Sequence, residues 1–425
     1  MSNKNLPLDS EKLVSFAKTV QTPFHFYDEK AIMDNARHFK EAFSWAPDFC
    51  NFFAIKACPN PAIIKRLASI GFGGDCSSLP ELYLSVACGI PGNRIVYTSN
   101  DTPDEEFKEA VRLGAIVNLD DITHIACLER AVGKLPETLC FRYNPGPART
   151  GNAIIGNPVE AKYGVTTDQL LDCYKIAKQK GVKHFGLHTM VASNELNREY
   201  IVETARMLFS LVVRIKKELD INIEFIDMGG GVGIPYKPEQ EPMDLDLLSK
   251  EMKALYDQMI VSEGLSVKIT FECGRMITGP YGYLLSKVLH VTKKYKDYVG
   301  LDACQADLMR PALYGSYHHI TVIGKNGVSK ANAPKTHKYD VTGSLCENCD
   351  KFAIDRELPE VEENDYIVLH DTGAHGYSMG FNYNAKLRHA EYLLQEDGTF
   401  KMIRRAETYD DYVKTLRFEG AEVEV

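Results

Sequence analysis

Several features are missing from this 425-residue sequence, and each absence argues against a class of protein. No apolar run is long enough to span a bilayer, so a membrane protein is not expected. Residues 1–7 lack the apolar core of a signal peptide. The eleven cysteines are scattered without framework spacing, which predicts reduced thiols and a cytoplasmic location. The net charge of −9 is spread along the chain and argues against nucleic acid as a partner.

Length and composition predict a packed fold with two domains, or one large barrel with an addition. Hydrophobic residues make up 44% of the chain and charged residues 25%, as is usual for packed soluble proteins. Neither an internal repeat nor a low-complexity linker is evident in the sequence.

Short β-rich runs recur through the first two thirds of the chain, and helical patterns separate most of them. The runs are 50–56, 71–78, 94–99, 115–121, 138–144, 184–190, 223–229 and 268–274. Amphipathic helices are predicted at 61–70, 103–113, 197–220 and 245–263. Eight β/α alternations favour an α/β fold with a TIM (β/α)8 barrel at 31–280, and an open doubly wound sheet is the alternative.

The pattern changes after about residue 280, where strand-like runs follow one another without long helices between them. These runs are 281–293, 298–302, 319–325, 339–343, 365–371 and 391–405. They predict a separate, mainly antiparallel C-terminal β-domain at 281–425. Residues 22–28 are also strand-like, so we expect the N-terminal segment 1–30 to join that sheet.

Lys56 ends the first barrel run, whose other residues are mostly apolar and typical of a buried strand. A buried lysine must shift its pKa, find a partner or become covalently bound. The C-terminal ends of TIM-barrel strands face one mouth, where active sites are built. The candidates at or near such ends are Lys56, Asp75, Asn144, His188, the loop at Gly229 and Glu272.

A glycine-rich segment, Asp227-Met-Gly229-Gly230-Gly231-Val-Gly233, follows the seventh predicted strand. Consecutive glycines let backbone N–H groups approach an anion closely, which favours a phosphate site. A tight strand-to-helix turn is the alternative interpretation. The spacing differs from G-x-G-x-x-G and no G-K-[ST] follows, so a Rossmann site or a P-loop is disfavoured.

Three polar side chains near the last barrel strands suit a cofactor with an aromatic ring. Glu272 is suited to keep a heterocyclic nitrogen protonated, which makes the ring an electron sink. Arg275 is suited to a phosphate or a carboxylate, although a structural Glu–Arg pair explains both residues equally well. His188 either lies flat against such a ring or is an ordinary hydrogen-bonded core histidine.

Two loops of the predicted β-domain are rich in reactive or polar groups. Cys346-Glu347-Asn-Cys349-Asp350 contains a C-x-x-C motif, but no second Cys or His pair accompanies it, so no metal site is predicted. A redox motif would need a thioredoxin-like βαβ setting, whereas a catalytic thiol and carboxylate are compatible with this loop. Segment 371–384, which contains His375, is either a functional loop or a plain β-turn.

In this order, the motifs resemble the fold-type III pyridoxal-phosphate decarboxylases, an alanine-racemase-like family, and within it the diaminopimelate decarboxylases. The resemblance extends from Thr22-Pro-Phe to Arg388-His-Ala-Glu391. The motifs are Phe-Ala-Ile-Lys56-Ala, Gly229-Gly230-Gly231, Glu272-x-Gly274-Arg275, Arg310-Pro-Ala-Leu-Tyr314, Cys346-Glu347-x-x-Asp350 and Gly373-Ala-x-Gly376. The resemblance implies pyridoxal 5′-phosphate as cofactor and a head-to-tail homodimer with shared active sites.

The resemblance also implies a role for each candidate residue. Lys56 binds the cofactor covalently, Glu272 pairs with the pyridine nitrogen, and His188 stacks on the ring. The remaining cofactor contacts are Asp75, Ser193, Gly230, Gly231, Gly274, Arg275 and His375. Cys346 reaches in from the other subunit as proton donor. The substrate contacts are Arg275, Arg310, Tyr314, Glu347 and His375, with Glu347 binding a substrate ammonium.

The implied reaction converts meso-diaminopimelate to L-lysine and CO2, a step of lysine biosynthesis. Loss of CO2 leaves a carbanion on Cα, which a protonated pyridine ring delocalises before a general acid delivers a proton. In the related ornithine decarboxylases an aspartate of the β-domain binds a distal ammonium. Arg310, followed by Tyr314, instead suits a distal carboxylate, which diaminopimelate has and ornithine and lysine lack.

Three departures from the family pattern leave other substrates open. The tyrosine of Gly-Ala-Tyr-Gly is His375 here, and the proline of Glu-Pro-Gly-Arg is Cys273. The His-x-Gly-Ser motif is replaced by residues 188–193, so we assign its phosphate contact to Ser193. The alternatives are decarboxylation of D-ornithine, D-lysine or a polyamine precursor, amino-acid racemisation, a cofactor-binding regulator, and a barrel enzyme without this cofactor.

Overall fold

The computed structural model describes residues 4–151 and 156–417, and this part of the chain divides into two compact units. One unit is Ala31–Pro280, and the other combines residues 4–30 with 281–417. Residues 1–3 and 418–425 of the predicted terminal segments lie outside the described part. Within the described residues, no helix has the length and apolar character needed to cross a membrane.

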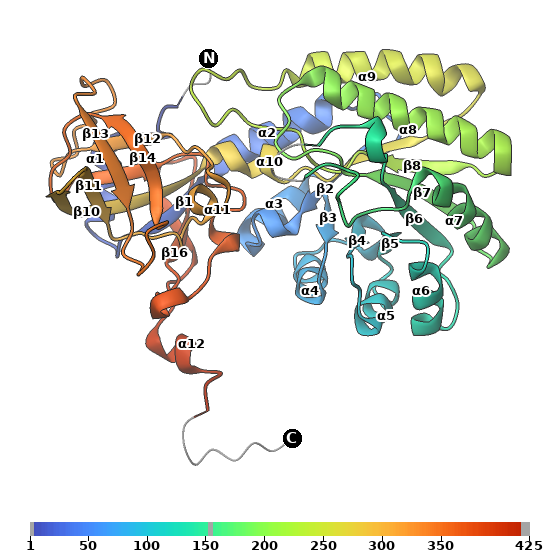
Figure 1. Ribbon diagram of the computed structural model, residues 1–425, viewed down its shortest axis with the longest axis horizontal. Helices are drawn as coiled ribbons and strands as arrows, with labels where there is room; N and C mark the ends of the chain where they lie inside the picture. Colours follow the sequence, from blue (N-terminus) through green and yellow to red (C-terminus); the bar gives the residue numbers. More distant parts are fainter. Residues whose placement is uncertain (1–3, 152–155, 418–425) are drawn as a thin grey trace. The chain divides into compact units, whose positions relative to one another are not determined.

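The first unit contains a closed barrel of eight strands paired in parallel, which confirms the predicted TIM barrel. Outer helices surround the strands (Figure 1). The strands are β2 (Cys50–Ala54), β3 (Gly73–Cys76), β4 (Ile95–Thr98), β5 (Ile116–Leu119), β6 (Thr138–Tyr143), β7 (His184–Thr189), β8 (Ile223–Asp227) and β9 (Lys268–Phe271). The helices are α2 (Glu29–Ala42), α3 (Pro61–Ser69), α4 (Leu79–Ala87), α5 (Asp104–Arg112), α6 (His124–Val132), α7 (Thr167–Gln179), α8 (Arg198–Leu219), α9 (Leu245–Met259) and α10 (Arg275–Thr278).

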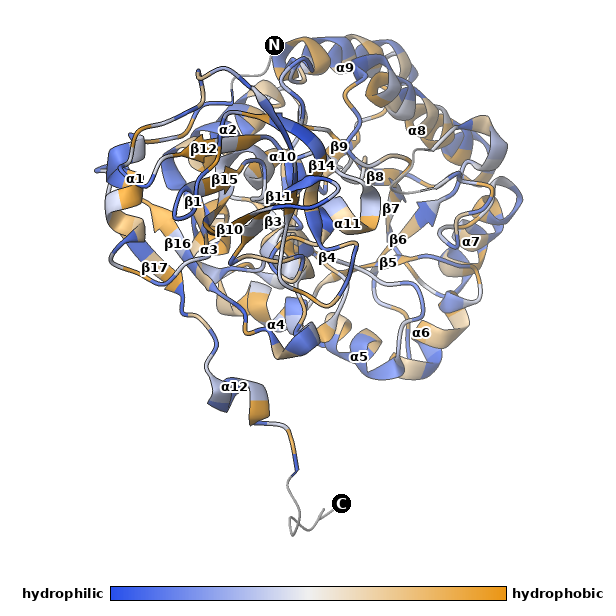
Figure 2. Cartoon of the chain, turned by 60° about the vertical axis from the view of Figure 1, so that its left-hand side comes forward, coloured by the Kyte–Doolittle hydropathy of each residue, from blue (hydrophilic) through white to orange (hydrophobic). Residues whose placement is uncertain are grey.

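Hydrophobic patterning explains why these segments form strands and helices. All residues of β2 are buried, as expected for a parallel strand covered on both faces. The outer helices carry both hydrophilic and hydrophobic residues (Figure 2). In α5, three acidic residues occupy the first turn, where the helix dipole favours them, while Phe107 and Ala110 are buried. Asn197 caps α8 by accepting the N–H of Glu199.

The first barrel strand ends earlier than predicted, and the difference concerns Lys56. Strand β2 stops at Ala54, and Ile55–Ala57 form a single 3-10 turn, η1. The side chain of Lys56 is 51% exposed, so the expectation of a buried lysine is wrong. Its amine is therefore accessible to an incoming molecule at the C-terminal mouth of the barrel.

The second unit is built on a nine-stranded sheet with mostly antiparallel pairs, which confirms the predicted β-domain. Residues 22–28 join it as predicted, because β1 (Phe24–Asp28) pairs with β10 and β16. The other strands are β10 (Gly282–Lys293), β11 (Asp297–Leu301), β12 (Ile320–Ile323), β13 (His337–Thr342), β14 (Lys351–Leu358), β15 (Tyr366–Leu369), β16 (Ala390–Leu394) and β17 (Phe400–Arg404). The helices are α1 (Ser10–Ala17), α11 (Arg310–Tyr314) and α12 (Tyr409–Val413).

Two details of this sheet differ from the sequence prediction. Strand β14 was not predicted, and it pairs with β13 in an irregular register. The predicted single strand 391–405 is a hairpin, in which β16 and β17 pair on either side of a turn at Gly398. Gly398 has a φ of +83°, a conformation that glycine adopts at little cost.

Candidate active site

Neighbouring strands of the barrel bring five ionisable side chains to its C-terminal mouth. Around the barrel, β7, β8, β9, β2 and β3 are consecutive. They carry, at or just after their C-terminal ends, His188, Asp227, Glu272, Lys56 and Asp75. Parallel strands direct these ends to one side, which explains how residues far apart in sequence form one cluster.

Lys56 and Asp75 form an ion pair at this mouth, with 2.8 Å between Nζ and Oδ2. Burial lowers the pKa of the Lys56 amine, but the carboxylates of Asp75 and Glu272 outweigh it, and the pKa lies above its ordinary value. Asp75 is 2% exposed, and burial together with the charge of Glu272 raises its pKa, against the opposing effect of Lys56. Before any ligand binds, the amine is thus held as an ammonium against Asp75.

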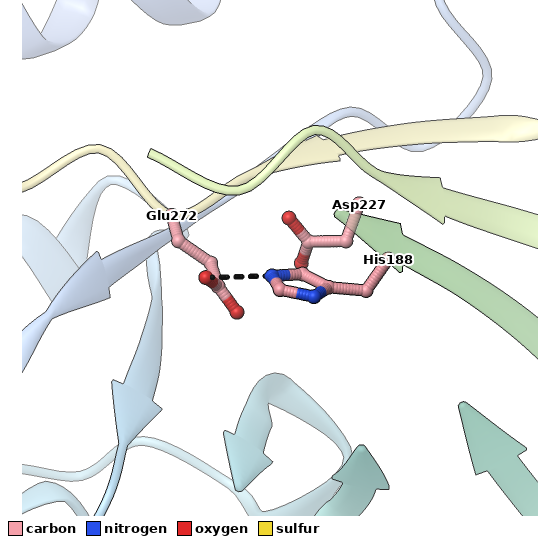
Figure 3. Close-up of side chains that lie close together, drawn as sticks. All are labelled: His188, Asp227 and Glu272. Atoms are coloured by element: carbon pink, nitrogen blue, oxygen red, sulfur yellow. Dashed lines mark hydrogen bonds and ion pairs between the residues drawn. The ribbon is translucent and has the colours of Figure 1, made fainter. Parts of the chain in front are cut away.

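His188, Glu272 and Asp227 turn toward one another from the ends of adjacent strands, as Figure 3 shows. The Nε2 atom of His188 lies 3.1 Å from Oε2 of Glu272, and all three residues are buried. Burial alone would raise the pKa of Glu272, but His188 outweighs it and the pKa is lowered. For Asp227, burial and the neighbouring Glu272 raise the pKa well above its ordinary value.

This cluster contains buried polar atoms that lack partners within the described residues. They are Nδ1 of His188, Oε1 of Glu272 and Oδ2 of Asp227. Buried polar groups are almost always hydrogen-bonded, because an unsatisfied one costs about 1–3 kcal/mol. Three such atoms in one cluster indicate a binding site whose ligand supplies the missing contacts.

The glycine-rich loop is packed tightly against the segment that follows β7. Gly229 and Gly231 have φ angles of +66° and +94°, which favour glycine. A Cβ at Gly229 would lie 2.4 Å from the carbonyl oxygen of Thr189, and one at Gly231 would lie 2.5 Å from that of Ala192. The glycines are therefore required by the fold as well as suited to a phosphate, and Ser193 lies in the adjoining segment.

Hydrogen bonds fix the glycine-rich loop and this segment to each other. Glu195 donates its backbone N–H to the carbonyl oxygen of Gly231 at 2.7 Å. Ile234 donates its N–H to Oδ1 of Asn194 at 2.9 Å. Asp227 accepts the N–H of Gly229 at 2.8 Å, which ties the loop to the end of β8. Both loops thus form one rigid wall of the mouth.

The end of β9 shows how the protein accommodates Cys273 in place of the expected proline. Asn51 accepts the N–H of Cys273 at 2.8 Å and donates to its carbonyl oxygen at 3.0 Å, and both residues are buried. Proline has no N–H, so the first of these bonds requires a non-proline residue here. A Cβ at Gly274 would lie 2.6 Å from Cβ of Ala57, so glycine lets this segment pack against the turn that carries Lys56.

Arg275 and Arg142 add positive charge to the barrel cluster. Arg275 is 8% exposed and donates from Nη1 to the hydroxyl of Tyr236 at 2.5 Å. Arg142, on β6, lies 3.6 Å from a carboxylate oxygen of Asp120 and over the ring of Tyr163. Burial raises the pKa of Glu272, and His188 lowers it. The charge of Arg142 adds a smaller lowering effect.

The sequence prediction missed Asp227, Arg142 and Asn51 as site residues. Asp227 is part of the glycine motif, and its carboxylate at the end of a predicted strand was the available signal. Arg142 lies in a predicted strand near its C-terminal end, which was the available signal. Asn51 gave none, because only the fold brings it beside Cys273. Asn144, a predicted strand-end candidate, instead binds backbone carbonyl oxygens of its own loop.

The remaining predicted residues belong to the second unit. Arg310 opens α11 and is 2% exposed, and its Nη2 donates to Oγ of Ser316 at 3.2 Å. Its guanidinium carbon lies 5.7 Å from the ring centre of Tyr314, which is 43% exposed. His375 is half-buried in the left-handed region with a φ of +55°.

Cys346 and Glu347 lie on the exposed loop between β13 and β14. Cys346 donates its backbone N–H to Oδ1 of Asn384 at 2.8 Å, and Glu347 accepts the hydroxyl of Tyr383 at 3.0 Å. The buried carboxylate of Asp350 closes the loop by accepting the N–H of Leu345 at 2.7 Å. The thiol and the carboxylate are thus presented to solvent by an ordered loop.

The barrel cluster has the chemistry of two kinds of site. One ligand atom from each of His188, Asp227 and Glu272 lies within 4.8 Å of the others, as in a metal site. The exposed amine of Lys56 and the glycine-rich loop instead suit an aldehyde cofactor with a phosphate group. Relatives of known identity distinguish the two.

Residues 29–279 match the family model described as pyridoxal-dependent decarboxylase, pyridoxal binding domain. The chain belongs to the pyridoxal-dependent decarboxylase family. Among its relatives, Protein TabA of Pseudomonas amygdali pv. tabaci is 39% identical, with 97% of this chain and 95% of TabA covered. The diaminopimelate decarboxylase of Methanothermobacter thermautotrophicus is 34% identical, with 94% and 93% covered.

Solved structures of amino-acid decarboxylases share this fold. Diaminopimelate decarboxylase from Helicobacter pylori complexed with L-lysine matches with a TM-score of 0.83 and 28% identity, covering 94% of this chain and 98% of that one. The M. jannaschii enzyme in complex with L-lysine matches with a TM-score of 0.86 and 30% identity, covering 96% and 94%. The lysine/ornithine decarboxylase from Vibrio vulnificus, at 18% identity and a TM-score of 0.76, shows the shared fold alone.

The protein is an amino-acid decarboxylase, and its cofactor is pyridoxal 5′-phosphate. The residues present fit this group. Lys56 offers an accessible amine, Oε1 of Glu272 is buried and lacks a partner among the described residues, and the glycine-rich loop lies on the neighbouring strand end. When bound, the cofactor supplies a protonated ring that stabilises negative charge developing on the substrate Cα.

Proposed function

We propose that this enzyme decarboxylates meso-diaminopimelate to L-lysine and CO2, as a cytoplasmic step of lysine biosynthesis. The observation that carries the substrate assignment is the buried guanidinium of Arg310, which suits a distal carboxylate. Diaminopimelate decarboxylases at 30–34% identity over more than nine tenths of the chain support it. So do the matching structures from Helicobacter pylori and M. jannaschii that contain L-lysine, the product of this reaction.

In this proposal, the polar groups predicted from the sequence share out the binding of cofactor and substrate. Lys56 would hold the cofactor through its amine, and Asp75 keeps the free ammonium in position. Glu272, kept ionised by His188, pairs with the ring nitrogen, and His188 lies against the ring. The backbone at Gly230, Gly231 and Gly274, with Ser193, Arg275 and His375, holds the phosphate or the carboxylate end of the substrate.

The exposed loop of the β-domain supplies the second half of the site in our proposal. Cys346 donates the proton to Cα after CO2 has left, and Glu347 binds a substrate ammonium. Both residues act in the site of the partner subunit of a head-to-tail homodimer. Arg310 and Tyr314 then hold the distal amino-acid centre. Cys346 and Glu347 are exposed, and the backbone of their loop is held by hydrogen bonds such as that from Cys346 to Asn384. This bond does not involve the Cys346 thiol, which supports an intermolecular role for it.

A second candidate is decarboxylation of a related amino acid, such as D-ornithine, D-lysine or a polyamine precursor. Two observations favour it. Protein TabA, whose name states no substrate, is 39% identical, more than the diaminopimelate decarboxylases at 30–34%, so similarity alone does not select diaminopimelate. His375 also replaces the tyrosine expected at a ligand contact. Racemisation of an amino acid on the same scaffold is the weaker alternative, because it needs a second base that faces Lys56.

A substrate panel tests the proposal directly. The enzyme, loaded with pyridoxal 5′-phosphate, is incubated with meso-diaminopimelate, both enantiomers of lysine and ornithine, and arginine. We expect CO2 release from meso-diaminopimelate at the highest kcat/KM. Faster turnover of a substrate without a distal carboxylate would replace the first proposal by the second. A change of optical rotation without CO2 would identify a racemase.

The covalent link is tested separately by reduction with borohydride and peptide mass analysis. We expect the pyridoxyl group on Lys56, because its amine alone combines access with a place in the cluster. Lys65, an exposed lysine of α3, provides the control position in the same digest. An adduct on another lysine would refute the site assignment whatever the substrate is.

A further inference from the structure

The loop that presents Cys346 also presents a second thiol that the proposed reaction does not use. Cys346 and Cys349 are exposed, whereas Cys127 is intermediate and the other eight cysteines are buried. Burial raises the pKa of the buried thiols of Cys76, Cys140 and Cys273, which makes them poor nucleophiles. The exposed pair therefore differs from the other thiols both in access and in sequence spacing.

Backbone hydrogen bonds fold the loop that carries the two cysteines back on itself. Gly343 donates its N–H to the carbonyl oxygen of Asp350 at 3.0 Å, so the two ends of the loop meet. Asp350 in turn donates its N–H to the carbonyl oxygen of Glu347 at 3.1 Å, which forms a turn across Cys349. Two residues, Glu347 and Asn348, lie between the two cysteines in sequence. A folded-back loop of this length is compatible with the roughly 4–7 Å Cα separation of a disulfide.

Side chains around the loop anchor its backbone and leave the Cys346 thiol free to move. The carboxylate of Asp350 is buried and accepts N–H groups of Gln305 and Leu345, both at 2.7 Å. Gln305 also places its amide nitrogen 3.7 Å from Sγ of Cys349. Cys346 is held through its N–H by Asn384, which does not involve its sulfur. None of these bonds engages the Cys346 sulfur, so they do not hold it away from Cys349.

We propose that Cys346 and Cys349 are a redox-modification site, at which a hydroperoxide converts the two thiols to a reversible disulfide. The peroxide oxidises one thiol to a sulfenic acid and leaves as water, or as an alcohol if it is organic. The second thiol then attacks that sulfur, forms the S–S bond and releases a water molecule. The two thiols lose two hydrogens and two electrons, and the O–O bond of the peroxide is reduced.

The modification has a functional consequence that rests on the proposed role of Cys346. A sulfur within a disulfide has no proton to donate, so oxidation removes the general acid. General acids contribute about 10²–10⁴-fold to a rate, so we expect oxidation to slow CO2 release by at least about 10²-fold. A thiol reductant restores the proton donor, and Cys349 thereby protects Cys346 from irreversible oxidation.

The test uses the reduced holoenzyme, treated with a small excess of hydrogen peroxide, with and without later addition of dithiothreitol. Trypsin releases residues 339–351, a peptide that contains both cysteines and no other. We expect this peptide to become lighter by two hydrogen masses and to resist alkylation, while CO2 release falls and then recovers with dithiothreitol. A peptide that keeps two alkylatable thiols while activity falls would overturn the proposal.

Two variants separate the disulfide from simple oxidation. Cys349→Ser should have normal activity before treatment. Prolonged exposure to peroxide should then carry its Cys346 past the sulfenic acid to the sulfinic acid, which dithiothreitol does not reduce, so activity does not return. Cys127→Ser, which removes the only half-exposed cysteine elsewhere in the described chain, should behave like the wild type. Full recovery of Cys349→Ser would refute the protective role. A disulfide that forms without loss of activity would support the modification site and refute Cys346 as the proton donor.

Discussion

Buried carboxylates occur in both units, but the two units treat them differently. At the barrel mouth, Asp75, Asp227 and Glu272 lie near one another, and mutual repulsion and burial raise the pKa of the two aspartates. In the β-domain, Asp340 is fully buried, yet it accepts hydrogen bonds from Lys296 at 2.7 Å and Lys351 at 3.0 Å. The carboxylates of the barrel mouth repel one another, and two of their oxygens lack hydrogen-bond partners among the described residues. The carboxylate of Asp340 has a lysine partner on each oxygen.

This difference between the two groups of carboxylates indicates which residues serve activity and which serve stability. A carboxylate whose partners come from the fold contributes to the free energy of folding. A carboxylate that is buried beside like charges, with an orphan oxygen, destabilises the fold until a ligand completes it. We therefore expect substitutions in the barrel cluster to reduce activity, and substitutions of satisfied β-domain residues to reduce stability.

The largest effect is expected for Lys56→Ala, which removes the amine from the barrel cluster. CO2 release should fall by about 10³-fold or more, because no other group can bind the cofactor aldehyde in this position. The absorbance of the bound cofactor should disappear with it. Thermal stability of the apoenzyme should fall rather than rise, because the buried carboxylate of Asp75 loses its ion-pair partner. Lys65→Ala, on α3, serves as the control, and comparable loss of activity there would contradict the assignment.

Arg310→Ala tests the main exception, a buried β-domain residue with a proposed role in the substrate site. A substrate carboxylate left without its guanidinium loses roughly 10²–10³-fold in kcat/KM, so turnover of meso-diaminopimelate should fall by that factor. Residual turnover of lysine-like substrates should change far less. Arg356→Lys provides a control, because this guanidinium lies over Tyr317 and binds the carbonyl oxygen of His318 within the β-domain. Equal losses on both substrate classes would remove Arg310 from the specificity site.

Asp340→Asn should shift stability rather than activity. Burial raises the pKa of Asp340, but Lys296, the N–H of Asp355 and Lys351 outweigh it, so the pKa is lowered. Loss of this charge should destabilise the β-domain by about 2–3 kcal/mol, because two ammonium groups lose a buried partner. Asp355→Asn is a matched control: it contacts the same Lys296 but is 54% exposed, and we expect at most about 0.5 kcal/mol.

Unfolding by urea, followed by two probes, separates the units in this experiment. Trp45 is the sole tryptophan of the sequence and belongs to the barrel, where its indole N–H donates to Oγ of Ser249. Its fluorescence reports on the barrel, while far-ultraviolet circular dichroism reports on the whole chain. A loss of stability confined to the Trp45 signal would contradict the proposed division between the units.

Sequence reasoning succeeded where hydrophobic pattern and strand order determine the answer. The eight barrel runs were found because buried parallel strands are short and apolar, as in β2. Strand β14 was missed because its apolar residues Phe352, Ala353 and Ile354 are consecutive, so the sequence shows no alternation of apolar and polar residues. The turn at Gly398 was missed because both flanking strands have similar composition.

The candidate site was predictable in its residue types but not in its geometry. Lys56, His188 and Glu272 followed from their places at strand ends, together with the family resemblance. The exposure of Lys56 depends on the one-turn helix after Ala54, which no local pattern indicates. The orphan oxygen of Asp227 depends on contacts across three strands, so only the folded chain reveals it.

The smallest expected effect concerns His319 of the β-domain, a residue with a lowered pKa. Burial lowers its pKa to about 4, and the positive charges of Lys335, Lys4 and Arg356 add to this effect. As pH falls from about 6.5 toward 4, His319 takes up a proton in the unfolded chain but not in the folded protein. The contribution of neutral His319 to the free energy of unfolding is therefore full above this pH range and is lost as pH falls through it.

His319→Gln should therefore reduce the loss of stability on acidification, by about 1–2 kcal/mol between pH 7 and 4.5 after allowance for solvent screening. Urea midpoints at both pH values, measured by circular dichroism, provide the comparison. His290→Gln is the matched control, because His290 is 74% exposed and pairs only loosely with Glu363 at 3.6 Å. If His319→Gln keeps the full acid sensitivity of the wild type, the buried His25 and His370, whose pKa burial also lowers, account for it instead.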